Sequence, residues 1–282
     1  MIKQFFKDLG NTIAATIKPM LLFVVVMDIW SVLIYGFDIV RLIAVTLLFF
    51  AVLIAMYAVI LLINTGKYGK VTRIENERGR YSDEYYQAVE EIAEKMNKPS
   101  KQLQRANILI LLAAHYLEGG RVDNALETLR KIDNGQLVRI PDTQPVKSMY
   151  YCVLIGIMIK KGDISSAITV CEQNKKLFDK HITNLRYGAE INHILCIIEF
   201  FKGNYSGVLK EMEERVYKKD PIDKVSDYLL CYRCEMRLGD SVKADEYMRK
   251  AENELEKCKW FHKEIMTPKI TALKENELEY KY

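Results

Sequence analysis

The hydrophobic residues of this chain are most concentrated near its N-terminus. Two strongly apolar segments, residues 19–35 and 42–63, flank a short break at Gly36-Phe37-Asp38. At 1.5 Å per residue they would form helices of about 26 and about 33 Å, and the hydrocarbon core of a bilayer is about 30 Å thick. The pattern therefore predicts a transmembrane hairpin of two helices over residues 19–64.

The residues around this hairpin predict its orientation. Residues 1–18 have apolar side chains at helical spacing and are expected to form an amphipathic segment, with a disordered terminus as the alternative. Residues 65–82 carry an excess of positive charge and predict a basic juxtamembrane linker. Because basic residues flank the hairpin on its two outer sides and are sparse in its loop, both termini and the large C-terminal part are expected in the cytoplasm.

Asp28 lies near the middle of the first apolar segment. A charged side chain at the centre of a bilayer costs about 2.5–3.5 kcal/mol on insertion scales, so such residues often have a role. One interpretation is a polar contact with another membrane subunit or a transported ion. The alternative is a protonated or locally hydrogen-bonded carboxyl group that a sufficiently apolar hairpin tolerates.

Beyond residue 82 the chain has the pattern of a helical array. A glycine followed by a polar or charged residue recurs at Gly120, Gly162, Gly203 and Gly239, with spacings of 42, 41 and 36 residues. Repeats of this length are typical of solenoids, because a single helix pair cannot bury its own apolar face. Residues 83–282 are therefore expected to form an all-α solenoid of about four helix pairs and a C-terminal capping helix. Gly79 precedes Gly120 by 41 residues, which leaves open a degenerate leading pair.

The repeat pattern resembles the tetratricopeptide repeat family over about residues 101–258. The first unit matches that family best, with Leu109, Leu112, Ala113, Tyr116, Gly120, Ala125 and Leu129. The later units keep only part of the pattern, and the spacings exceed the family's repeat of about 34 residues. The extra residues are expected at breakers such as Asn134-Gly135 and the segment around Pro221.

The resemblance implies a concave groove that binds protein or peptide segments and is lined by the first helix of each pair. Carried over by position, the lining is Asn107, Ile110, Ala114, Leu117, Met149, Cys152, Gly156, Ile159, Glu190, His193, Ile197, Phe200, Ser226, Leu229, Arg233 and Met236. Two alternatives remain open. These apolar residues could form the core of a tightly wound array, or the segment from Trp260 to Tyr282 could fill the groove.

Charge and motifs do not indicate catalysis or nucleic-acid binding. The chain has 41 basic and 37 acidic residues, and its large C-terminal part is neutral, whereas nucleic-acid-binding domains are usually basic. There is no phosphate-binding loop, no nucleophile elbow and no metal-ligand spacing among the four histidines. Cys231 and Cys234 form a C-x-x-C inside a predicted helix, which favours structural thiols. We therefore expect no enzymatic activity, metal, cofactor or small-molecule substrate.

Two hypotheses for the function follow. The first is a membrane-anchored interaction scaffold whose cytoplasmic groove binds partner segments. The second is an accessory or regulatory subunit of a membrane transport or secretion complex, which would contact that complex through the hairpin and Asp28.

Overall fold

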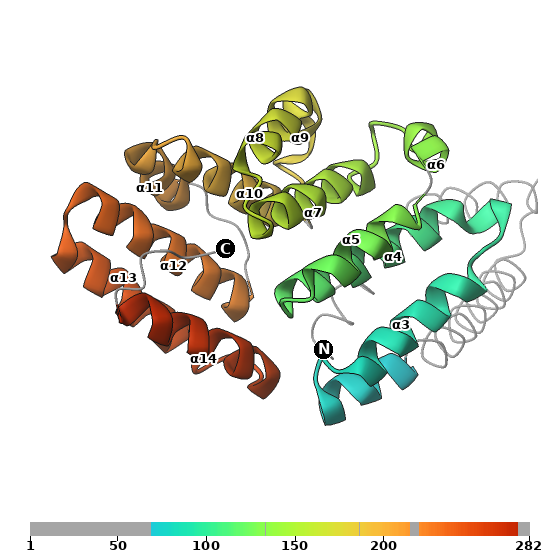
Figure 1. Cartoon of the computed structure of the whole chain (residues 1–282), viewed down its shortest axis with the longest axis horizontal. Coiled ribbons are helices and arrows are strands. Elements are labelled where there is room, and N and C mark those ends of the chain that lie inside the picture. The colour runs from blue at the N-terminus through green and yellow to red at the C-terminus, as the bar shows by residue number, and fades with distance from the viewer. Residues whose placement is uncertain (1–68, 133, 186, 215–219, 276–282) are drawn as a thin grey trace, which may run out of the picture. The chain divides into compact units, whose positions relative to one another are not determined.

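The computed structural model describes residues 69–132, 134–185, 187–214 and 220–275, whose regular elements are all helices (Figure 1). The chain divides into two compact units, Met1–Gly69 and Lys70–Tyr282. The expected all-α class is therefore confirmed for the described residues. The amphipathic segment, the hairpin and Asp28 lie outside these residues. Within the described ranges, no helix is both long and apolar enough to cross a membrane.

The helices of the second unit follow one another with short connections. Residues 69–78 are helical, and the elements after them are α3 (Asp83–Lys95), η1 (Pro99–Lys101), α4 (Gln102–Glu118), α5 (Val122–Arg130), α6 (Asn134–Arg139), α7 (Val146–Lys160), α8 (Ile164–Gln173), α9 (Lys175–His181), α10 (Gly188–Phe201), α11 (Tyr205–Glu214), α12 (Pro221–Leu238), α13 (Ser241–Leu255) and α14 (Trp260–Lys274).

Left-handed glycines form the turns inside the helix pairs. Gly120, Gly162, Gly203 and Gly239 have φ between 78° and 85° and join α4 to α5, α7 to α8, α10 to α11 and α12 to α13. Glycine adopts positive φ without the steric cost that a Cβ brings, so a local sequence signal places these turns. Gly79 has φ 86° and joins the 69–78 helix to α3. The helical array thus includes a leading pair and reaches into the segment expected as a linker.

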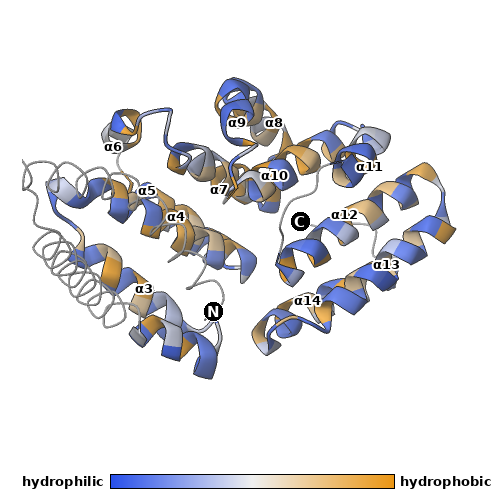
Figure 2. Cartoon of the chain, turned by 180° about the vertical axis from the view of Figure 1, so that it is seen from behind, coloured by the Kyte–Doolittle hydropathy of each residue, from blue (hydrophilic) through white to orange (hydrophobic). Residues whose placement is uncertain are grey.

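The first helices of successive pairs pack against one another, α4 on α7, α7 on α10 and α10 on α12. Figure 2 shows largely hydrophobic residues on α10 and mostly hydrophilic ones on α13. The second helix of each pair packs closely against the first helix through a small or compact residue, five positions after the turn glycine. Ala125, Ala167, Val208 and Ala244 are each at most 1% exposed. Burial of these faces between neighbouring pairs is the main stabilising term of such an array.

Two additional short helices explain why the first two spacings, 42 and 41 residues, exceed 34 residues. α6 lies at the expected breaker around Asn134-Gly135, whereas α9 was not expected from the sequence. α9 is held by Phe178, which is completely buried in the core with Ile155 and Ile191, and by His181, whose Nε2 lies 2.9 Å from the carbonyl oxygen of Asp142. Each insertion follows the second helix of a pair and therefore leaves the first helices free to stack.

Helix α14 covers the last pair and also meets the beginning of the array. Its residues Met266, Ile270 and Leu273 are buried in one cluster with residues of α12 and α13. Its first turn packs on the leading pair, because the Phe261 ring lies edge-on to Tyr81 with centroids 5.9 Å apart. Lys259 forms an ion pair of 3.2 Å with Glu75 beside this contact. The capping helix expected from the sequence therefore contacts the two ends of the array.

We predict that Gly79→Ala destabilises the chain more than Gly162→Ala. The two glycines have similar positive φ, so both alanines carry the same backbone strain of about 1–2 kcal/mol. A Cβ at Gly79 would lie 3.0 Å from the Cβ of Phe261, whereas a Cβ at Gly162 meets no atom within 4 Å. Overpacking should add about 1–3 kcal/mol at Gly79. Denaturant unfolding of the full chain measures this difference, and equal losses would show that the Phe261 contact is not tight.

Candidate functional site: a charged cavity on the inner helices

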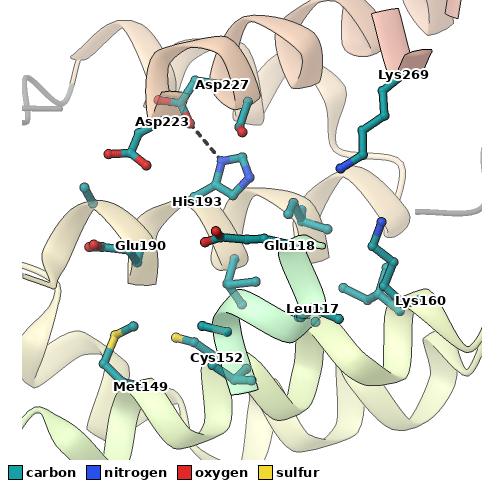
Figure 3. A pocket seen from close by; sticks show the side chains of 18 residues that line it. Leu117, Glu118, Met149, Cys152, Lys160, Glu190, His193, Asp223, Asp227 and Lys269 are labelled. Carbon is teal, nitrogen blue, oxygen red and sulfur yellow. Dashed lines mark hydrogen bonds and ion pairs between the residues drawn. The ribbon is translucent and has the colours of Figure 1, made fainter. Parts of the chain in front are cut away.

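A cavity of about 290 Å³ lies where the first helices of the pairs converge with α14 (Figure 3). Its lining comes from the end of α4, the length of α7, the beginnings of α10 and α12, and one residue of α14. The lining residues are Ala114, Leu117, Glu118, Met149, Cys152, Val153, Gly156, Ile159, Lys160, Ala189, Glu190, His193, Ile194, Ile197, Asp223, Ser226, Asp227 and Lys269. The volume is at the lower end of the range of about 300–1,000 Å³ typical of small-ligand pockets.

Part of the groove expected from the sequence lines this cavity. Leu117, Cys152, Ile159, Glu190, His193 and Ile197 do so, together with Ala114, Met149, Gly156 and Ser226. Residues Asn107, Ile110, Phe200, Leu229, Arg233 and Met236 do not. The first helices of the pairs line the cavity over only part of their length. The predicted groove included residues along the whole of each of these helices, so some of its residues lie outside the cavity.

The expected groove residues outside the cavity have other surroundings. Ile110, Phe200 and Leu229 are at most 7% exposed and belong to the hydrophobic core. Arg233 places its guanidinium group 5.0 Å from the centre of the Phe200 ring. Met236 packs at the edge of the α12–α13 cluster. Asn107 is partly buried on α4. These side chains contribute to the packing between helices and do not line the cavity.

Most of the charged lining residues were missed from the sequence. Glu118, Lys160 and Asp227 each directly follow a residue that had been assigned to the groove. Glu118 and Lys160 end α4 and α7. A charge at a helix end usually reads as solvated, and Lys160 also complements the negative C-terminal end of the helix dipole. Asp223 and Lys269 lie at positions for which the family resemblance implied no role. The sequence signal that could have identified Glu118, Lys160 and Asp227 is a charged residue directly after a residue of the predicted inner face.

The acidic side of the cavity combines residues of α10 and α12. Glu190 and His193 project from α10, and Asp223 and Asp227 project from α12 (Figure 3). His193 Nδ1 lies 2.8 Å from an Asp227 carboxylate oxygen. Asp223 accepts a hydrogen bond of 3.2 Å from the backbone N–H of Asp220, which completes the capping box of α12. Burial raises the pKa of Asp223 above its ordinary value, against the effect of this hydrogen bond.

The basic side consists of Lys160 and Lys269, which extend from α7 and α14 with their ammonium groups toward each other (Figure 3). Burial is the main cause that lowers the pKa of Lys160 to about 8, and the positive charges of Lys269 and Arg233 add to it. Burial also lowers the pKa of Lys269, whereas Glu118 opposes this shift. Within the described residues, no carboxylate oxygen lies within 4.0 Å of the Lys269 ammonium nitrogen. Two cations thus share one partly desolvated wall.

Glu118 connects the cavity to the contact between α14 and the leading pair. Its carboxylate accepts a hydrogen bond of 3.2 Å from the Tyr81 hydroxyl, and that hydroxyl oxygen lies 3.0 Å from Nδ1 of His262. Tyr81 has a single hydroxyl hydrogen, so donating it to Glu118 requires that His262 donates its Nδ1–H to Tyr81. Surrounding protein raises the pKa of Glu118, although its side chain keeps access to solvent in the cavity.

The cysteines do not form a reactive site. Five of the six are buried, and Cys231 and Cys234 lie inside α12 as free thiols. Burial raises the pKa of Cys171 to about 11 and that of Cys234 to about 12, which disfavours the nucleophilic thiolate. Among the residues that the structure describes, no cluster of three His, Cys, Asp or Glu side chains could hold a metal ion.

Comparisons with protein-family models, curated proteins and solved structures find no match for this chain. The class of molecule that its geometry defines is an all-α array of helix pairs with a charged inner cavity. The similarity to tetratricopeptide repeats stays a prediction, and the function has to be inferred from the cavity itself.

We predict that stability falls between about pH 6.5 and 4 and that His262 contributes to this loss. Burial, with the charges of Arg80 and Lys259, lowers the pKa of His262 from 6.5 to about 4 in the folded chain. The unfolded chain therefore binds a proton at a higher pH than the folded chain does, and the free energy of unfolding decreases as the pH falls through this window. One such proton gives a slope of up to about 1.4 kcal/mol per pH unit.

Denaturant unfolding of the full chain at several pH values tests this effect. His262→Gln should reduce the slope, and a smaller slope should remain because burial also holds the pKa of His115 well below its ordinary value. An unchanged slope in the variant would show that His262 is solvated.

Proposed function

We propose that this chain is a membrane-anchored interaction scaffold, in which the inner cavity of the helical array binds a segment of a partner protein. The observation that carries this proposal is the cavity itself, which is lined by the first helices of four successive pairs. Its walls combine apolar residues such as Ile194 and Ile197 with a few charged groups. Such a lining suits recognition, since apolar contacts supply affinity and placed polar groups supply orientation.

The position of α14 favours a binding site over a groove filled by the chain's own C-terminal helix. Met266, Ile270 and Leu273 of α14 are buried against α12 and α13, and only Lys269 reaches the cavity lining. The helix therefore forms a wall of the cavity and leaves its volume free. A helix lying in the groove would have buried its apolar face against α7 and α10 instead.

The anchor is the part of the proposal that rests on the sequence. Residues 19–64 have the length and composition of two membrane spans, with basic residues on the outer flanks. Tethering the array to the cytoplasmic face would raise its effective concentration toward partners at the same membrane. The proposal assigns no catalytic step to the chain.

A second candidate function is favoured by Asp28 alone, the acidic residue within the first apolar segment. In this alternative the chain is an accessory subunit of a membrane transport or secretion complex and contacts it through the hairpin. Replacing residues 19–64 by an unrelated anchor of two spans distinguishes the two. The scaffold would keep its partners with the foreign anchor, whereas the subunit would lose them, and Asp28→Leu alone should weaken its assembly.

We predict that Gly156→Leu prevents partner binding without unfolding the chain. Gly156 lines the cavity on α7, and a Cβ there would meet only the flexible end of Leu117, at 2.7 Å. The leucine side chain would therefore occupy the cavity, and replacing a helical glycine should not weaken α7 itself. Partner capture by the full chain in mild detergent, followed by mass spectrometry, measures the effect.

Ser206→Leu is the matched control, because Ser206 is exposed on α11 outside the cavity. The control should capture the same proteins as the wild type, whereas Gly156→Leu should lose a defined subset. Thermal unfolding confirms that both variants are folded. Retention of every partner by a folded Gly156→Leu chain would refute the cavity as the binding site.

A further inference from the structure

We propose that the contact between α14 and the leading pair is pH-sensitive and opens when the buried His262 takes up a proton. This contact joins residues 259–262, at the start of α14, to residues 75–81 of the leading pair, and we call it the closing contact. The inference goes beyond the scaffold function, because it concerns the response of the chain itself to acid. It makes the closure of the array a regulated state.

The apolar part of the closing contact is small. Phe261 is 2% exposed and packs against Tyr81 and the turn at Gly79. Residues that attach α14 to the last pair, such as Ile270 and Leu273, lie later in the helix. The closing contact can therefore be lost while α14 stays on α12 and α13.

A proline separates the closing contact from the second half of α14. Pro268 lies inside the helix, where it has no N–H to donate to the carbonyl group of residue 264. Prolines inside helices are common sites of bending. The first half of α14 can thus move away from the leading pair without unfolding the second half.

The polar part of the closing contact is a chain of hydrogen bonds that contains His262. This side chain is 7% exposed, and its Nδ1 lies 3.0 Å from the hydroxyl oxygen of Tyr81. Tyr81 in turn donates to a carboxylate oxygen of Glu118 on α4, at 3.2 Å. The neutral imidazole supplies the Nδ1–H that this chain needs. A second proton on His262 adds a positive charge that the hydrogen bonds do not require.

The charged groups nearest to His262 come from both sides of the closing contact. Arg80 precedes Tyr81, Lys259 precedes α14, and Glu75 belongs to the 69–78 helix. Glu75 forms ion pairs with both cations, at 3.0 Å and 3.2 Å. Burial is the main cause that lowers the pKa of His262 to about 4, Arg80 and Lys259 add to this shift, and Glu75 opposes it.

A second buried histidine lies close to these groups. His115 on α4 is 5% exposed, and its Nδ1 lies 3.1 Å from the hydroxyl oxygen of Tyr85 on α3. Burial holds the pKa of His115 well below its ordinary value, and the charges of Arg80 and His262 add to this effect. Protonation of either imidazole therefore disfavours protonation of the other in the closed array.

Protonation favours the open state, because solvent returns His262 to its ordinary pKa. Above pH 6.5 the imidazole is neutral in both states, and pH has little effect. For one histidine with a pKa of about 4 in the closed contact and 6.5 in the open one, the ratio of open to closed chains rises about 20-fold between pH 7 and pH 5. Global unfolding has many more contacts to break, so the closing contact opens first.

The test is amide hydrogen exchange of the full chain in mild detergent at several pH values between 7.5 and 5. Protection factors remove the intrinsic effect of pH on exchange. We expect protection at residues 79–86 and in the first turns of α14 to fall about 20-fold between pH 7 and pH 5. Protection in α10, at the centre of the array, should change much less.

His262→Gln should remove this pH dependence, because glutamine keeps a hydrogen-bond donor but does not titrate. His181→Gln is the matched control. His181 is also buried, but it lies on α9 outside the closing contact, where its Nε2 donates to the carbonyl oxygen of Asp142. This control should show the same 20-fold fall as the wild type. Thermal unfolding at pH 7.5 confirms that both variants are folded.

Three results would overturn the proposal. The first is constant protection of the closing contact in the wild type down to pH 5. The second is an equal loss of protection in α10, which would show global unfolding without local opening. The third is a fall that persists in a folded His262→Gln chain. The first two are measured on the wild type, so they decide the question even if the variant does not fold.

Discussion

The packing of Phe261 against the turn at Gly79 is the contact on which the rest of this arrangement depends. An array of helix pairs has an apolar face at each end that no further pair covers. Here α14 buries its own apolar residues on the last pair and places Phe261, only 2% exposed, against the first turn. That contact determines where Lys269 lies. It therefore also determines that α14 forms a wall of the cavity instead of filling it.

The charges inside the cavity are costly for a helical array. Burying an ionisable group carries a desolvation penalty that apolar side chains of similar size would avoid. Lys160, Lys269 and Asp223 all have pKa values shifted toward their neutral forms by burial, which is the expression of this penalty. Perturbed titratable groups that gather in a cavity point to a functional site.

Much of the fold could be predicted from the sequence, because its signals are local. The turns at Gly120, Gly162, Gly203 and Gly239 need positive φ, and that requirement acts within a few residues. The alternative of a leading pair with its turn at Gly79 is also present in the structure. Helix α9 was not predicted. Its position depends on Phe178, which packs in the core against residues distant in the sequence, and a local sequence pattern carries no information on such contacts.

The cavity could be predicted only in part, for a geometric reason. Leu117, Cys152 and His193 line it as expected, because helical periodicity places them on the inner face. Which stretch of each helix converges depends on how the helices cross, and periodicity carries no such information. Ile110 and Phe200 were therefore assigned to the groove although they lie in the core. The pairing of Lys160 with Lys269 depends on the return of α14, a contact between distant parts of the chain.

Amide hydrogen exchange of the full chain, compared between the wild type and Phe261→Ala, tests most directly whether the two ends of the array meet. If they do, the substitution should accelerate exchange at residues 79–86 as well as in the first turn of α14, because both lose the same contact. Exchange in α8 and α11, whose buried residues belong to another hydrophobic cluster than those of α14, should stay unchanged. Faster exchange confined to α14, with residues 79–86 as protected as in the wild type, would contradict the contact and the cavity wall that depends on it.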